Sequence, residues 1–179
     1  MHTLRYDAPR VLVERFGPRR FTHALDLGCG TGLCGALLRP LAQRLTGVDL
    51  SAQMLQKAQA LGVYDTLQQA DVVEFLAAGD ERFDAVVAAD VFIYVGALDD
   101  VFRLLSQRMQ AGGVFAFTVE ESAEGEVVLR ESLRYAHSEA GLRRLADAHG
   151  FRFTALERRP VREEQRRPIA GLFAWLEKI

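Results

Sequence analysis

The residues best suited to chemistry in this 179-residue chain are a glycine-rich turn and three aspartates. The segment ALDLGCGTGLCG, residues 24–35, has four glycines and two cysteines directly after an apolar run. A glycine-rich turn after the first strand of a doubly wound sheet lets a ligand approach the backbone closely. Gly28 and Gly30 match the first two glycines of the dinucleotide fingerprint, whereas Leu33 stands where that fingerprint requires its third.

The three aspartates stand at the ends of three successive predicted strands. Asp26 lies two residues before Gly28, where its carboxylate suits a positively charged ligand or an amino group better than a pyrophosphate. Asp49 lies 21 residues after Gly28, where a carboxylate accepts both hydroxyls of an adenosine ribose. Asp71 could meet an adenine edge. Each aspartate alone could orient a loop or cap a helix instead, but the three together favour a nucleoside site.

Composition restricts the class of protein further. The net charge of −2 gives no reason to expect nucleic acid, and no apolar run approaches the roughly 18 residues that a membrane helix needs. The amino-terminal residues lack the continuous apolar block of a secretory signal, so we expect a cytoplasmic protein. Cys29 and Cys34 are expected to be free thiols that pack in the interior. The four histidines are scattered without metal-ligand spacing, so we predict no metal site.

Short β-rich apolar runs alternate with helical patterns along the chain, which predicts an α/β fold. We expect a single domain, residues 1–179, built on a doubly wound sheet of seven strands that is mostly parallel, with the last strand antiparallel. The predicted strands cover residues 23–28, 44–50, 66–71, 83–95, 114–120, 151–159 and 169–178. The predicted helices cover residues 33–43, 52–62, 72–79, 97–113 and 138–150. Residues 120–126 and residues 157–168 are predicted to be loops.

With these elements in place, the chain resembles the class I S-adenosylmethionine-dependent methyltransferases over essentially its whole length. Five segments carry the resemblance: ALDLGCGTG, TGVDLSAQML, QADVVEFL, FDAVVAADVFIYV and MQAGGVFAFTVE. The segment RYAHSEAGLRRLADAHGF further resembles a bacterial branch whose members often carry tetratricopeptide repeats, which this sequence does not contain. The resemblance implies a Rossmann-like sheet, S-adenosylmethionine as cofactor and methyl transfer to an acceptor.

The resemblance also implies where the cofactor binds. The loop Gly28–Gly32 would pack under the methionine part and the ribose, Asp49 would bind the ribose hydroxyls, and Asp71 would read the adenine. Asp90 would meet the methionine part or, equally, cap the next turn. The predicted cofactor-binding residues are Tyr6, Asp26, Gly28, Cys29, Gly30, Gly32, Asp49, Leu50, Met54, Asp71, Val72, Ala89 and Asp90.

Methyl transfer from a sulfonium chiefly requires that the nucleophile be aligned and that water be excluded. We expect the acceptor to approach over the end of the fourth strand, where Tyr94 either closes the methyl pocket or packs in the core. His137 is the candidate general base, because a histidine titrates near neutrality. The alternative is a surface histidine that precedes Ser138, the N-cap of the last helix.

Three further segments are expected to complete the site. Residues 1–20 would form a helical lid from which Arg5 or Tyr6 contacts the cofactor, or pack as an ordinary helix. Residues 120–138 would form an acceptor-side insertion. The segment 157–168 would bring arginines to the cofactor edge to bind an acidic acceptor, or would be a solvated loop balanced by glutamates. The arginines and glutamates concerned are Arg158, Arg159, Arg162, Arg166, Arg167, Glu163 and Glu164.

The sequence therefore predicts a methyltransferase that acts on a small-molecule acceptor, with an acidic acceptor as one option. A non-catalytic module that binds S-adenosylmethionine or S-adenosylhomocysteine is the alternative of a different class. A nicotinamide-dependent oxidoreductase is disfavoured by Leu33 and by Asp26. The segment ADVFIY stands where an NPPY tetrad would follow the fourth strand, which argues against base or amide-nitrogen acceptors of that type.

Overall fold

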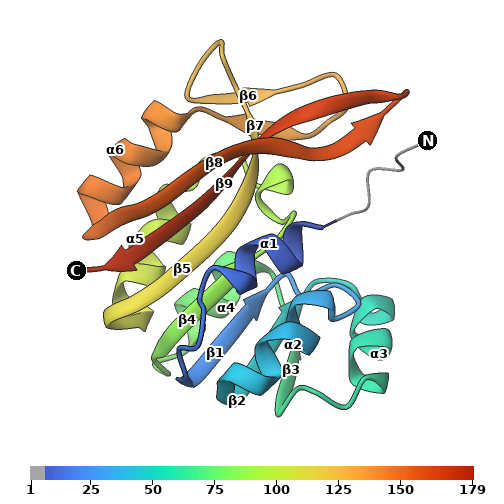
Figure 1. Cartoon of the computed structure of the whole chain (residues 1–179), viewed down its shortest axis with the longest axis vertical. Coiled ribbons are helices and arrows are strands. Elements are labelled where there is room, and N and C mark those ends of the chain that lie inside the picture. Colours follow the sequence, from blue (N-terminus) through green and yellow to red (C-terminus); the bar gives the residue numbers. More distant parts are fainter. Residues whose placement is uncertain (1–6) are drawn as a thin grey trace.

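The computed structural model describes residues 7–179. In this part of the chain a nine-stranded sheet is covered by helices on both faces (Figure 1). The strands are β1 (Phe21–Leu27), β2 (Ala42–Asp49), β3 (Thr66–Gln69), β4 (Phe83–Ala88), β5 (Met109–Glu121), β6 (Val127–Leu129), β7 (Tyr135–His137), β8 (Phe151–Glu164) and β9 (Arg167–Lys178). The α-helices are α1 (Ala8–Glu14), α2 (Leu33–Leu38), α3 (Ala52–Ala60), α4 (Val72–Ala78), α5 (Asp99–Arg108) and α6 (Glu139–His149), and the 3₁₀ turns are η1 (Arg39–Leu41) and η2 (Phe92–Tyr94). Within the described residues, no helix is long and apolar enough to cross a membrane.

Strands β3, β2, β1, β4 and β5 lie side by side in that order and are all parallel. β9 pairs with β5 in antiparallel register, from Val114 opposite Glu177 to Glu120 opposite Gly171. β8 pairs antiparallel with β9, so it runs in the same direction as the parallel strands. The prediction of a doubly wound, mostly parallel sheet with an antiparallel last strand is confirmed, with more strands than the seven expected.

The two additional strands, β6 and β7, form a short hairpin beside the end of β5. Glu120 pairs with Ala136 of β7 and with Gly171 of β9, so these two strands flank β5 on opposite sides. β7 therefore continues the sheet on the side of β4, beyond Ala88, where β4 ends. Each strand of the hairpin is three residues long. Such strands are too short to give a periodic pattern, which is why neither was predicted from the sequence.

The strands alternate between two apolar layers, as the period of two in a strand requires. In β1, Leu25 and Leu27 belong to the layer covered by α4, α5 and α6, whereas Ala24 belongs to the layer covered by α1 and α2. The first layer contains edge-to-face phenylalanine pairs, such as Phe102 with Phe115 at a centroid distance of 5.7 Å. Each such side chain, fully buried, contributes about 1.5–3 kcal/mol. The two layers fix the carboxyl ends of β1, β2 and β4 at one edge of the sheet.

Two element boundaries differ from the prediction near this edge. β4 ends at Ala88 instead of continuing to Val95, and the turn η2 follows. The reason is Asp90, whose left-handed φ of 61° ends the extended conformation. α5 ends at Arg108, and the next residues already belong to β5, so the predicted helix over residues 97–113 was too long.

The prediction of a loop over residues 157–168 was wrong. β8 runs to Glu164 and β9 begins at Arg167, and the two strands pair up to these residues. Gln165 and Arg166 join them with φ values of 48° and 62°, as in a two-residue hairpin turn. This part of the hairpin extends beyond the sheet core (Figure 1). Much of it is exposed, so its sequence lacks the alternation of apolar and polar residues that predicts a strand.

Candidate functional site

The glycine-rich turn connects β1 to α2 and has three residues in the left-handed region. Gly28, Gly30 and Gly32 have φ values of 69°, 53° and 98°, where a Cβ atom is strained. A Cβ atom at Gly28 would also overlap Val91, whereas at Gly30 it would meet nothing within 4 Å. The backbone at Gly30 is therefore open to close approach by a ligand, and Gly32 occupies the N-cap position of α2.

Asp49 ends β2 beside this turn. Its Oδ2 accepts a hydrogen bond from the Gly30 N–H at 2.9 Å, and its Oδ1 accepts one from the Ser51 N–H at 2.8 Å. A carboxylate has about four lone-pair sites, so each oxygen keeps capacity for one further donor. Two adjacent ribose hydroxyls would fit this arrangement.

Asp26 lies in β1 before the turn and is 1% exposed. Its Oδ2 accepts a hydrogen bond from the Tyr64 hydroxyl at 2.6 Å. Burial raises the pKa of Asp26 to about 7, against the opposing effect of this hydrogen bond. Sequence reasoning missed Tyr64, which lies between α3 and β3 and belongs to none of the segments that carry the resemblance.

Two adjoining cavities open at this edge of the sheet, one of about 570 Å³ and one of about 550 Å³. Both volumes are typical of small-ligand sites. We call them the first and the second lobe. The residues of the first lobe include Asp26, Cys29, Gly30, Cys34, Met54 and Ala89, and those of the second include Leu50, Asp71 and Val72. Both lobes are lined by Gly28, Asp49, Ser51, Asp90 and Tyr94. These shared residues mark the junction of the lobes.

The structure therefore brings most of the predicted cofactor-binding residues together around one site. Gly32 lines neither lobe within the described chain, and its part is to start α2. Tyr6 and Arg5 lie outside the described residues. Asp71 lines the second lobe and also caps α4, since its Oδ1 accepts the Val73 N–H at 2.8 Å. Capping and adenine recognition are thus compatible at this position.

The described part of the predicted lid, residues 7–20, contains α1. This helix packs on the sheet: Leu12 is fully buried, and its carbonyl accepts the Trp175 Nε1–H at 3.0 Å. Pro9, near the start of the helix, lines the first lobe. α1 is thus part of the core and also reaches the site.

Asp90 and Tyr94 stand at the junction of the lobes. The Asp90 N–H donates to the Thr118 hydroxyl at 2.9 Å. The idea that Asp90 caps the next turn was wrong, because η2 begins after Val91 without a side-chain cap. Tyr94 is 71% exposed, so its alternative place in the core was also wrong. The side chain is not packed because η2 carries it out of the sheet beyond the end of β4.

His137 is buried in β7 at 2% exposure, so the alternative of a surface histidine was wrong. Its Nε2–H donates to the Gly96 carbonyl at 2.8 Å, and its Nδ1 is buried with no partner among the described residues. Burial lowers the pKa of His137, so the ring is neutral near pH 7. Among the described residues it lines neither lobe, so its role as general base stays a prediction.

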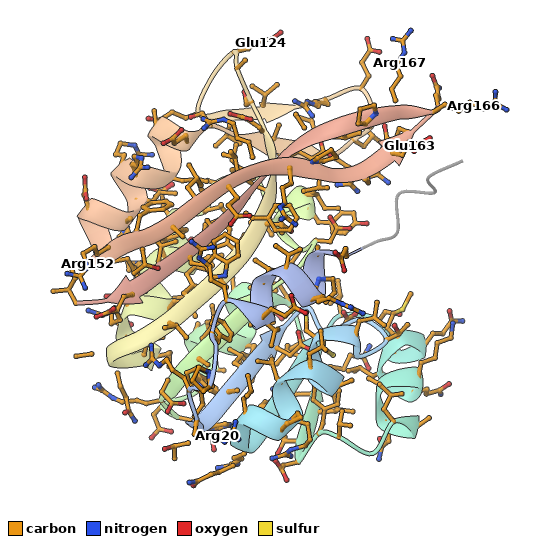
Figure 2. The ribbon with its side chains drawn as sticks, viewed as in Figure 1. Arg20, Glu124, Arg152, Glu163, Arg166 and Arg167 are labelled. Carbon is orange, nitrogen blue, oxygen red and sulfur yellow. The ribbon has the colours of Figure 1, made fainter. Side chains whose placement is uncertain are left out.

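Of the five arginines predicted to reach the site, Arg162 has a contact at the junction of the lobes. Its Nη2 lies 2.8 Å from Glu120 Oε1 and 3.4 Å from Asp90 Oδ1. Arg158 pairs with Glu121 and Glu139, and Arg159 pairs with Glu157. Arg166 and Arg167 lie at the tip of the β8–β9 hairpin, together with Glu163 (Figure 2). The glutamates that pair with these arginines come mainly from other elements, which the local sequence could not indicate.

This geometry can be compared with known proteins. The methyltransferase domain family matches residues 25–117, which is 93 of the 179 residues. A malonyl-[acyl-carrier protein] O-methyltransferase from Enterobacter lignolyticus is 36% identical over 107 residues, which cover 60% of this chain and 42% of that protein. Human Methyltransferase-like protein 27 is 42% identical over 105 residues, which cover 55% of this chain and 40% of that protein. The chain thus spans about two fifths of the length of these curated relatives.

The fold also resembles that of solved methyltransferase structures. The N-methyltransferase NodS from Bradyrhizobium japonicum, solved with S-adenosyl-L-homocysteine, superposes with a TM-score of 0.75 at 19% identity, covering 97% of this chain and 85% of that one. Three observations indicate the same family: a methyltransferase fold, a glycine turn open at Gly30 and a family match over more than half of the sequence. The chain belongs to the methyltransferase domain family, the class I S-adenosylmethionine-dependent methyltransferases.

Proposed function

We propose that this chain transfers a methyl group from S-adenosylmethionine to a small-molecule acceptor. The observation that carries the proposal is the pairing of Asp49 with the open turn at Gly30, where the carboxylate keeps two free lone-pair sites. Both groups line the first lobe, so a nucleoside held by Asp49 would lie directly against the Gly30 backbone.

The remaining lining residues suit the other parts of the cofactor. The second lobe offers Leu50, Val72 and the capping carboxylate of Asp71 to an adenine ring, and the first lobe offers the buried carboxylate of Asp26 to an amino group. S-adenosylmethionine supplies the methyl group as part of a sulfonium. Its sulfur connects the two halves, so the junction of the lobes is the place for transfer. Asp90 and Tyr94 would then border the reacting atoms and exclude water from them.

The acceptor is proposed to approach from the side of residues 120–138, whose β6–β7 hairpin continues the sheet beyond β4. An acidic acceptor would be oriented by Arg162. Its contact with Asp90, at 3.4 Å, is longer than a normal ion-pair hydrogen bond and could be exchanged for an acceptor carboxylate. The malonyl group in the name of the Enterobacter lignolyticus relative carries such a carboxylate.

Calorimetric titration tests the cofactor part of this proposal. S-adenosylmethionine and S-adenosylhomocysteine should bind the wild-type chain, and the variant Asp49→Ala should lose both. NAD serves as the control ligand and should not bind, because the family match leaves no support for a nicotinamide-dependent oxidoreductase. Binding of NAD alone would overturn the proposal.

Turnover is then measured as release of S-adenosylhomocysteine with a panel of dicarboxylates, amines and hydroxyl compounds. Arg162→Lys should weaken the use of dicarboxylates, whereas Arg166→Lys, the same change at the hairpin tip, should not. Cofactor binding without turnover on any compound would favour the alternative of a non-catalytic binding module.

A further inference from the structure

Tyr64 fills a narrow slot between elements that are distant in sequence. The slot is formed where glycines replace side chains at Gly32 in the turn, Gly35 in α2 and Gly47 in β2. A Cβ atom at Gly47 would lie 2.7 Å from Tyr64 Cε1, one at Gly32 would lie 3.3 Å from Cε2, and one at Gly35 would overlap the phenol oxygen. The Tyr64 ring therefore occupies space that exists because these three positions have no side chain.

The slot directs the Tyr64 hydroxyl to Asp26. The hydroxyl donates to Asp26 Oδ2 at 2.6 Å, a length typical of a strong O–H···O⁻ hydrogen bond. Asp26 lines the first lobe, whereas Tyr64 lines neither lobe within the described chain. The hydrogen bond to Asp26 is therefore the direct link between the Tyr64 hydroxyl and the first lobe.

The surroundings of Asp26 make that influence strong. Burial raises its pKa to about 7, the hydrogen bonds from Tyr64 and from the Gly35 N–H lower it, and the charge of Asp49 raises it. The other titratable groups close to Asp26 are the thiols of Cys29 and Cys34, and burial raises the pKa of both, so these thiols stay neutral. Asp26 thus changes charge near neutrality, with the Tyr64 hydroxyl as the main side-chain group that favours its ionised form.

We propose that Tyr64 is a positioning residue that holds the Asp26 carboxylate in place for the first lobe and thereby selects ligands that carry an ammonium group. The inference rests on the proposed function, since the amino group of S-adenosylmethionine and of S-adenosylhomocysteine is the ammonium concerned. Tyr64 does not take part in methyl transfer itself. Its effect is on the affinity for the cofactor and on the pH dependence of that affinity.

The test compares Tyr64→Phe with wild type by calorimetric titration of S-adenosylhomocysteine from about pH 5.5 to about pH 7, below the pKa of about 7.7–8.0 at which α-amino groups lose their proton. The wild-type affinity should rise with pH as Asp26 ionises. The variant lacks the hydrogen bond that favours ionisation, so its rise should move upward by about one pH unit or more, with binding weaker by about fivefold or more at pH 7. A rise at the same pH in both proteins would overturn the inference.

A second ligand separates positioning from a merely structural effect. 5′-Methylthioadenosine has the nucleoside but no ammonium group, so its affinity should be independent of pH over this range and equal in wild type and Tyr64→Phe. Equal weakening of both ligands in the variant would mean that Tyr64 only supports the turn, which contradicts the inference. Asp26→Asn should remove the pH dependence for S-adenosylhomocysteine, and retention of that dependence would also contradict it.

Two controls keep the outcomes distinct. Tyr135→Phe makes the same substitution at a half-buried tyrosine of β7 and should leave both ligands unaffected. If wild type binds neither ligand, the proposed function fails and this inference fails with it. If wild type binds both ligands and Tyr64→Phe behaves like Tyr135→Phe, only the role of Tyr64 is refuted.

Discussion

Gly30→Ala separates ligand approach from protein stability at the glycine turn. The added Cβ atom would meet no protein atom within 4 Å, so it creates no clash inside the protein. It would, however, project into the space that the cofactor needs for contact with the Gly30 backbone. We therefore expect a variant that folds but has lost most of its affinity for S-adenosylhomocysteine.

The magnitudes follow from the local geometry. The left-handed φ of 53° at Gly30 costs an alanine about 1–2 kcal/mol, which lowers the melting temperature by about 2–4 °C per kcal/mol in a chain of this size. An extra methyl group forced against a close-packed ligand costs about 1–3 kcal/mol, or roughly 5- to 150-fold in affinity. Gly17 offers a matched control, because it has a φ of 61° and also nothing within 4 Å of a Cβ atom, but lines neither lobe in the described chain.

Thermal denaturation and calorimetric titration with S-adenosylhomocysteine measure the two effects on the same samples. Gly17→Ala and Gly30→Ala should lose similar stability, and Gly30→Ala alone should lose affinity. If Gly30→Ala binds as tightly as Gly17→Ala, the ligand does not approach the backbone at this turn, and the assignment of the first lobe is refuted.

Three further predictions concern charged groups. Asp71→Ala removes the cap of α4 and should cost about 1 kcal/mol in thermal denaturation, which Asp71→Ser should largely restore. The pKa of Asp26 is raised from 3.8 to about 7 in the folded protein. Its stabilising contribution is therefore present below about pH 3.8 and is lost as the pH rises through about 7. Because an asparagine does not titrate, the melting temperature of Asp26→Asn relative to wild type should increase from pH 5 to pH 8. Arg162→Met leaves the buried Glu120 with Arg130 as its remaining ion-pair partner and should cost about 1–3 kcal/mol in urea unfolding, and Glu120→Gln in the same chain should recover part of that loss.

The strand ends that form the site were predictable because apolar runs mark where parallel strands stop. Asp49 ends such a run, whereas Asp71 follows the short polar strand TLQQ and was placed at the same edge by its position between that strand and the next helical pattern. The environment of Tyr94 and His137 was not predictable in the same way. Tyr94 is exposed because of the way the chain turns after β4, and His137 is buried because its strand pairs beside β5. No local sequence pattern indicates either arrangement.

Tyr64 and the β8–β9 hairpin show two other limits of sequence reasoning. The slot for Tyr64 is built from glycines in three separate elements, and their common purpose is apparent only when the elements are packed. The outer part of β8 is exposed and charged, so its pattern matches a solvated loop as well as a strand. Both features depend on neighbours that come from distant parts of the chain.

The position of β9 has a consequence for biosynthesis. It follows the other eight described strands in sequence, yet it lies between β5 and β8, which are both made before it. Until residues 171–177 leave the ribosome, the edge of β5 from Val114 to Glu120 has no partner on that side. α1 also lacks one of its packing partners until then, because its Leu12 carbonyl accepts a hydrogen bond from Trp175 of β9. An unpaired apolar strand edge promotes association between chains, so the nascent protein is most prone to such association before residues 171–177 have emerged.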